Sequence, residues 1–261
     1  MPKAKRKAKK KAVIDDSLKN NIYTGDIIIP DKIKKKRHIG NLNESGLHNA
    51  IKHYYQRSGD RVEVKTGRYY IDIVRDDELI EIQTSNFTSI RNKLKSLLNE
   101  YKVRLVYPIP EKKYIVRVSP DTGEIISRRK SPKHGKITDL FNELLRIPGM
   151  INHENFVFEV ILCNVEEYRC KDGNGSWRRQ GDSIIERKLI DVIETVEFKD
   201  KYDFMTFLID TKDNPFTTKK LAKKKNVSVG LARKIAYTLY GMGLIERVGK
   251  EGNSYLYLLA K

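Results

Sequence analysis

Two acidic residues inside short apolar runs constrain the fold of this chain more than any other feature. Asp72 and Glu81 each have an isoleucine on both sides within residues 71–82, where two strands are joined by a charged turn. A carboxylate in a core strand costs on the order of several kcal/mol unless its charge is compensated. A bound divalent cation would supply that compensation, and it would turn the folding cost into a chemical site.

The charge balance points to a polyanionic partner. The 261 residues include 52 Lys and Arg against 34 Asp and Glu, which gives a net charge of +18. Each phosphate that such a protein neutralises releases condensed counterions, so nucleic acid is the expected partner. A solubilising surface is the simpler alternative interpretation.

Composition also bears on location. No apolar run reaches 18 residues, so no membrane association is expected. No apolar stretch follows the basic N-terminus, which argues against a secretory signal. Cys163 and Cys170 are not in a CxxC pair, so a reducing compartment is expected, and we predict a cytoplasmic protein.

Composition and periodicity divide the chain into four parts. Residues 1–41 contain two basic runs and are expected to form a flexible arm. Residues 42–111 form an α/β core, residues 112–200 an α+β middle region whose role the sequence does not indicate, and residues 201–261 a helical segment with a terminal hairpin.

The core is predicted to run helix, three strands, helix, strand. Leu47, Ile51 and Tyr54 have helical spacing and mark the buried stripe of the first helix. The strands fall near residues 61–64, 68–74 and 79–84, and a helix follows over 87–101. A last strand, 103–107, ends before Pro108. The strand–helix–strand step implies a parallel pair.

Asp72 and Glu81 can converge on one cation if their strands are neighbours in the sheet. Mg²⁺ or Mn²⁺ needs only one or two carboxylates, with waters and phosphate oxygens completing the shell. Glu44, in the first helical turn, could bind a second ion, although a first-turn glutamate also complements the helix dipole. Asp72 could instead pair with Arg68, Arg75 or a lysine.

These residues resemble the PD-(D/E)xK nuclease superfamily, which includes restriction endonucleases and Holliday junction resolvases. The resemblance covers about residues 43–110. It carries the motif aspartate to Asp72, the second acid to Glu81, the usual lysine position to Gln83 and the resolvase-type helix glutamate to Glu44. The resemblance implies a restriction endonuclease-like mixed sheet flanked by helices, and the whole chain looks like an uncharacterised prokaryotic family of that type.

Gln83 is a departure from that pattern, because glutamine can orient a water but cannot act as a base or carry charge. Lys93, on the following helix, is a candidate for the missing cation, although a solvated helix face is the simpler interpretation. His48 lies one helical turn after Glu44 and could approach the site, but a surface position is the more ordinary one.

The last segment reads as helix, helix, turn, helix and hairpin, which is typical of a winged helix-turn-helix. Arg233 and Lys234 are candidates for base contacts, with Ser228 at the helix start. The other predicted nucleic-acid contacts are Lys219, Lys220, Lys223 and Lys250. Winged helices also bind proteins, so that alternative stays open.

Together these features predict an enzyme, a Mg²⁺-dependent DNA endonuclease that hydrolyses phosphodiester bonds and is targeted by the C-terminal segment. A catalytically silent nuclease-fold DNA-binding protein is one alternative, and a winged-helix regulator is another. Cleavage of both strands usually needs two active sites, which makes a homodimer an open option.

Overall fold

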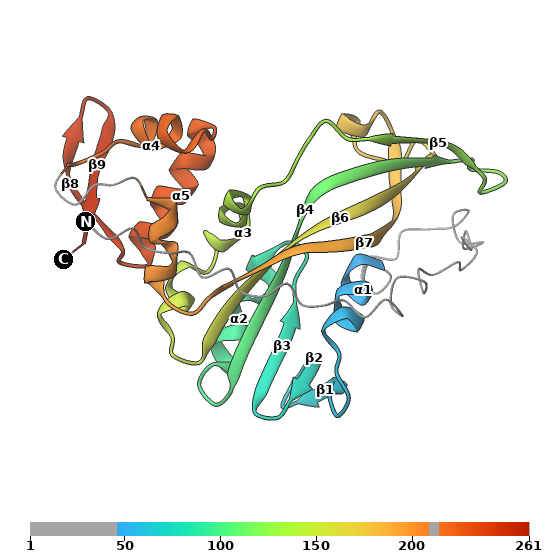
Figure 1. The fold of residues 1–261 in the computed structure, drawn as a ribbon, viewed down its shortest axis with the longest axis horizontal. Helices are drawn as coiled ribbons and strands as arrows, with labels where there is room; N and C mark the ends of the chain where they lie inside the picture. The colour runs from blue at the N-terminus through green and yellow to red at the C-terminus, as the bar shows by residue number, and fades with distance from the viewer. Residues whose placement is uncertain (1–45, 209–213, 261) are drawn as a thin grey trace, which may run out of the picture. The chain divides into compact units, whose positions relative to one another are not determined.

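The computed structural model describes residues 46–208 and 214–260, and it shows a mixed α/β fold built on one large sheet (Figure 1). The seven strands follow the order β1-β2-β3-β4-β6-β7, and β5 pairs with β4. The expected basic arm, 1–41, and the candidate Glu44 lie outside the described residues. The strands of the sheet are β1 (Arg61–Thr66), β2 (Tyr69–Arg75), β3 (Glu78–Ile82), β4 (Lys102–Val118), β5 (Ile125–Lys130), β6 (Phe156–Lys171) and β7 (Asp182–Phe198).

The sheet combines antiparallel and parallel pairing. β1, β2 and β3 form an antiparallel meander, β3 and β6 each run parallel to β4, and β7 returns antiparallel to β6. The parallel pair of β3 and β4, connected through helix α2 (Phe87–Leu97), confirms the crossover predicted from the sequence. A large mixed sheet flanked by helices is therefore the architecture of the chain.

Helices cover both faces of the sheet. Helix α1 (Gly46–Tyr55) buries Leu47 and Ile51 against one face. The partners of this layer in the sheet are Ile73, Ile80, Ile82, Val106, Ile161, Cys163 and Val165. Helix α2 packs on the larger core at the opposite face through Phe87, Ile90, Leu94 and Leu97. Because side chains alternate along a strand, Leu79 and Ile80 serve different layers.

One predicted core position of α1 is wrong. Tyr54 is 56% exposed, and Tyr55 takes the buried side instead. The phenol of Tyr55 donates a hydrogen bond to Oε1 of Glu159 on β6 at 2.5 Å. The buried stripe therefore runs at strict spacing of four through Leu47, Ile51 and Tyr55, which a choice between adjacent tyrosines could not reveal from sequence.

Strand β4 does not end at Pro108, as the sequence suggested. It continues through Pro108 and Pro110 to Val118, with β6 beside it all the way. The backbone N–H and C=O groups of even-numbered residues in this stretch point toward the β3 side, because the carbonyl of Val106 accepts from the amide of Gln83. Among the residues that the structure describes, no strand pairs with 107–113 on that side, so the two prolines lack an N–H where no ladder needs one. The expected domain boundary at 111/112 consequently falls inside β4.

The middle region is the outer half of the same sheet rather than a separate fold. β5 pairs with the end of β4 as an antiparallel hairpin, and β6 and β7 extend the sheet on the other side. The short helices of the region are η3 (Ile137–Leu140), α3 (Phe141–Leu144), η4 (Pro148–Asn152) and η5 (Trp177–Arg179).

The C-terminal segment has the element order that the sequence predicts, except that its first helix is a 3-10 helix, η6 (Lys201–Phe207). Thr217 caps α4 (Thr218–Lys225), and Ser228 caps α5 (Val229–Gly241) with a bond from the amide of Leu231. The strands β8 (Ile245–Glu251) and β9 (Ser254–Leu259) form a separate hairpin. None of the helices that the structure describes is long and apolar enough to cross a membrane.

A buried ion cluster ties the outer half of the sheet together. The carboxylate of Glu167 on β6 is 1% exposed and contacts Lys113, Arg169 and Arg187 at 3.2, 2.6 and 3.0 Å. Burial alone would raise the pKa of Glu167, but the three cations outweigh it and lower the pKa to about 2. Neutralising this group would leave three partly buried cations without their counter-ion.

Glu167→Gln should lower the free energy of unfolding by about 2–4 kcal/mol near pH 7. Because the folded-state pKa lies below the unfolded one, the loss should shrink as the pH falls from about 4.5 toward 2. Urea denaturation near pH 7 and at about pH 3.5 measures both. Glu166→Gln, which removes a pair with the half-exposed Arg128, is the matched control and should cost less than about 1 kcal/mol. Equal losses in the two variants would contradict the buried-cluster account.

Candidate active site

The ladder between β2 and β3 opens at the two acids that the sequence singled out. Ile73 pairs with Ile80, so the next positions along the strands are Asp72 and Glu81. There the amide of Ile82 donates to Oδ2 of Asp72 at 2.8 Å rather than to a backbone carbonyl. The carboxylate of Asp72 thus occupies the point where the two strands separate, which we call the β2–β3 fork.

Strand β1 adds a third carboxylate to the fork. Glu63 lies opposite Asp72, between the paired residues Val62 and Val64, and its φ of 52° is left-handed. Non-glycine residues rarely adopt this region inside a strand, and such positions cluster at functional sites. Nζ of Lys52 on α1 contacts Oε1 of Glu63 at 2.7 Å.

These residues surround a pocket of about 440 Å³. Its walls come from both covering helices and from the first three strands. The lining residues are His48, Glu63, Tyr70, Ile71, Asp72, Glu81, Ile82, Gln83 and Lys93. Five of the six residues predicted for the active site therefore line one pocket: His48, Asp72, Glu81, Gln83 and Lys93. The sixth, Glu44, lies outside the described residues.

Lys93 is the clearest correction to the sequence analysis. Its side chain is only 18% exposed, so it does not lie on a solvated helix face. The ammonium group contacts Oε1 of Glu81 and donates to the carbonyl of Tyr70. Helix α2 thereby brings a positive charge to the acid of β3.

His48 and Gln83 have different roles from one another. Nε2 of His48 lies 3.2 Å from Oδ2 of Asp72, so α1 reaches the fork from the face opposite α2. The amide nitrogen of Gln83 donates to the carbonyl of Ser85 at 2.5 Å. The side chain of Gln83 is thus bound to the turn that follows it. The positive group that contacts Glu81 is the ammonium of Lys93.

The two buried acids have their pKa values shifted in opposite directions. Burial raises the pKa of Glu81 to about 7. The ammonium of Lys93 lowers this pKa and the charge of Asp72 raises it, but burial is the largest effect. Burial would also raise the pKa of Asp72, but His48, the amide of Ile82 and Lys93 together lower it below the usual value. Near pH 7, Asp72 is ionised while Glu81 is poised between its two forms. Such a separation is characteristic of functional carboxyl pairs.

The donor set of the pocket fits a hard divalent cation. Asp72 and Glu81 offer two carboxylates, and Mg²⁺ in proteins is usually held by one or two. Within residues 46–208 and 214–260, no group of three or more His, Cys, Asp or Glu could hold a metal ion alone. A cation here would take its remaining ligands from water and from a substrate.

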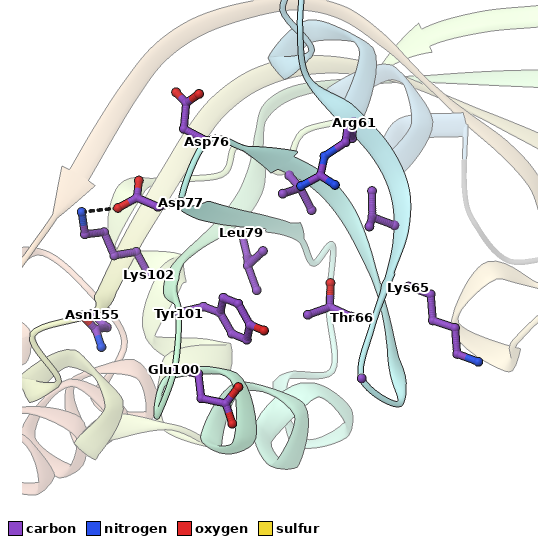
Figure 2. A pocket seen from close by; sticks show the side chains of 13 residues that line it. Arg61, Lys65, Thr66, Asp76, Asp77, Leu79, Glu100, Tyr101, Lys102 and Asn155 are labelled. Atoms are coloured by element: carbon purple, nitrogen blue, oxygen red, sulfur yellow. Dashed lines mark hydrogen bonds and ion pairs between the residues drawn. The ribbon is translucent and has the colours of Figure 1, made fainter.

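A larger pocket of about 610 Å³ lies elsewhere and shares no lining residue with the first. Figure 2 shows its acids, Asp76, Asp77 and Glu100, around an apolar floor that includes Leu79 and Tyr101. Asp77 is exposed and pairs with Lys102 at 2.6 Å. Its charged side chains are exposed, so it lacks the buried acids that make the smaller pocket a candidate for catalysis.

Sequence reasoning missed three residues of the smaller site: Lys52, Glu63 and Tyr70. Lys52 follows His48 by four residues on α1, and this helical spacing is a signal that could have been used. Glu63 stands in an ordinary alternating strand, and its left-handed backbone has no mark in the sequence. Tyr70 contributes a backbone carbonyl, which sequence does not distinguish.

The residues of the C-terminal segment that were predicted to contact nucleic acid differ in their surroundings. Lys219, Lys223, Arg233 and Lys234 are all exposed. Of these, Lys234 has its Nζ engaged, because it donates to Oδ1 of Asn142 at 2.7 Å. The hydroxyl of Ser228 is occupied as the cap of α5. Lys220 lies 3.8 Å from Glu251, and Lys250 lies 5.3 Å from the ring centre of Tyr255.

Residues 45–199 match a domain of unknown function (DUF8091), which spans the sheet and the whole pocket, and the chain belongs to that family. A protein of Treponema pallidum (strain Nichols) with the name "Uncharacterized protein" is 33% identical over 164 residues. That alignment covers 62% of this chain and 65% of the length of the relative. No solved structure matches the chain.

Glu81→Gln should raise the free energy of unfolding by about 1–3 kcal/mol near pH 8, because a buried carboxyl no longer has to ionise. The folded-state pKa lies above the unfolded one, so the native chain loses stability as the pH rises from about 4.5 to 7. The gain from the substitution should therefore disappear near pH 5. Urea denaturation at the two pH values tests this, with the exposed Glu100→Gln as control. A loss of stability at both would show that the contact with Lys93 is simply structural.

Proposed function

We propose that this chain is a metal-dependent DNA endonuclease with a restriction endonuclease-like core of the PD-(D/E)xK type. The observation that carries the proposal is the convergence of Asp72, Glu81 and Lys93 in one pocket at the β2–β3 fork. An aspartate and a second acid on adjacent strands, with a lysine beside them, are the residue types that this chemistry needs.

Asp72 and Glu81 are the residues that would hold Mg²⁺ or Mn²⁺. When bound, such a cation supplies a Lewis acid that polarises the phosphodiester and activates a water molecule. The protein contributes the shape and charge of the site. His48 and the amide of Ile82 orient Asp72, while the carbonyl of Tyr70 holds the ammonium of Lys93 in the pocket.

Lys93 supplies the ammonium group that the motif usually has at the position of Gln83. Its ammonium can neutralise the charge that develops on a phosphate, a role that glutamine cannot perform. The same departure supports the alternative of a catalytically silent DNA-binding protein. The two proposals differ in the role of Lys93. It acts in cleavage in the first and only balances the charge of Glu81 in the second.

Incubation of the protein with supercoiled plasmid and Mg²⁺ or Mn²⁺ should give nicked circles, or linear DNA where both strands are cut. Asp72→Asn and Glu81→Gln should each lower the rate at least about 100-fold, because each removes a ligand of the cation that would stabilise charge at the reacting phosphate. Asp77→Asn changes an exposed acid on the adjoining turn and is the matched control. EDTA should abolish the reaction.

Lys93→Gln should also slow cleavage, by about 10–1000-fold, and Lys93→Arg should restore part of the rate. The rate of the native protein should rise with pH through about 7, as Glu81 ionises. Binding of DNA without cleavage by any metal would favour the silent alternative. Cleavage that survives Asp72→Asn would exclude the fork as the site.

We further propose that the C-terminal segment is a winged helix that binds DNA. Helix α5 has 13 residues and carries Arg233, Tyr237 and Tyr240 at helical spacing on an exposed face. The guanidinium of Arg247 on β8 lies 4.5 Å from the ring centre of Tyr240 and 4.2 Å from that of Tyr255. A cation held between aromatic rings next to an exposed helix suits contact with DNA.

A basic segment beside the sheet supports the same partner. Residues 128–136 contain five Lys and Arg and no acid. The segment is fastened to β4, since the amide of Ser131 donates to Lys113 and that of Gly135 to Pro110, at 2.7 and 3.1 Å. A Cβ on Gly135 would lie 2.2 Å from the carbonyl oxygen of Pro110, so this close approach requires glycine.

Arg233→Gln combined with Arg247→Gln should weaken duplex DNA binding by about tenfold or more and reduce its salt dependence. Lys234→Gln removes one charge from the same helix at a position bonded to Asn142, and it should have a much smaller effect. Fluorescence anisotropy of a labelled duplex at several salt concentrations measures both. Equal losses in the two variants would contradict this assignment of the binding face.

A further inference from the structure

The chain presents its only tryptophan to solvent. Trp177 lies in the connection between β6 and β7 and is 88% exposed. An indole normally buries most of its surface, because it carries the largest apolar area of any side chain. An almost fully exposed tryptophan outside the candidate active site therefore needs a reason of its own.

The loop that carries Trp177 is internally braced. The amide of Gly175 donates to the carbonyl of Gly181 at 2.9 Å, and the amide of Gln180 donates to that of Trp177 at 2.9 Å. A Cβ on Gly175 would lie 1.8 Å from the carbonyl oxygen of Asp182, so the loop closes tightly on itself. A braced loop can engage a ligand with little further loss of conformational entropy.

Positive charge accompanies the indole. Arg178 is exposed, and Nε of the half-buried Arg179 donates to the carbonyl of Asp182 at 3.0 Å. The carboxylate of Asp182 is buried and pairs with Arg117 at 3.1 Å, while that of Asp172 accepts from the amide of Asn174 at 3.0 Å. The two acids that flank the loop are thus engaged, Asp182 with Arg117 of β4 and Asp172 with the loop backbone, and the exposed groups of the loop include an aromatic ring and a cation.

We propose that the Trp177 loop, residues 173–181, binds single-stranded DNA by stacking the indole on an unpaired base, with Arg178 and Arg179 near the adjoining phosphates. Aromatic rings beside cations are the usual means of holding single strands, because every base has a π-face and every linkage has a charge. A membrane surface would require a larger apolar face than one indole. A protein partner would require an apolar surround that this loop lacks.

This inference adds an unpaired strand to the partner of the proposed nuclease, at a surface separate from the β2–β3 fork. It shares with the proposed function only the assumption that the partner is DNA. Binding can be measured in EDTA, where a metal-dependent enzyme does not cleave. The two proposals can therefore fail independently.

The single tryptophan makes the test specific, because the intrinsic indole emission of the full chain reports on this loop alone. Titration with a short oligothymidylate in EDTA should quench that emission to saturation, and a blunt duplex of equal length should quench it much less. Binding seen by anisotropy of labelled single strands without any change in indole emission overturns the proposal. Equal quenching by the duplex, or quenching by RNA alone, also overturns it.

Trp177→Ala should weaken single-strand binding by about 5- to 100-fold, and Trp177→Phe should retain most of it. Tyr54→Ala is the matched control, since Tyr54 is 56% exposed on α1 and lies outside both the Trp177 loop and the C-terminal segment proposed to bind DNA. Circular dichroism verifies that the variants are folded. Unchanged affinity in folded Trp177→Ala, or an equal loss in Tyr54→Ala, overturns the assignment.

Discussion

The hydrogen bond from the amide of Ile82 to the carboxylate of Asp72 is the interaction on which the candidate site depends. It replaces a backbone bond of the β2–β3 ladder with a side-chain bond, so the strands can separate without leaving a buried amide unpaired. The opening admits Lys93 from α2 and His48 from α1. If a backbone hydrogen bond stood there instead, Asp72 would be an ordinary strand residue and the pocket would not open between the two strands.

The candidate site contains a buried carboxyl group whose ionisation lowers the stability of the fold. Glu81 is buried with a pKa near 7, while Asp72 is held ionised by its neighbours. Elsewhere in the sheet, Glu167 shows how a purely structural acid is treated: three cations surround it and its pKa falls to about 2. The contrast between these acids is the electrostatic argument that the fork has a function and the Glu167 cluster a structural role.

Long strands connect the candidate active site to two basic surfaces elsewhere on the sheet. β4 and β6 begin beside the core and extend through the middle region, so the same sheet supports the fork, the segment 128–136 and the Trp177 loop. Pro108 and Pro110 concealed this continuity in the sequence, because proline normally ends a strand. They are accommodated because, in the part of the chain that the structure describes, no strand pairs with the edge that their missing N–H groups face.

The sequence by itself determined the elements of the core, the pairing of β3 with β4, the helix cap at Ser228, and the nomination of Asp72 and Glu81. These features depend on periodicity and on local hydrogen bonds, which short windows of sequence contain. Only the tertiary structure decided that Lys93 is enclosed, that Lys234 bonds to Asn142, and that Glu63 joins the fork through a left-handed backbone. Each of these depends on which residues distant in the chain are brought together, and packing rather than local pattern sets that arrangement.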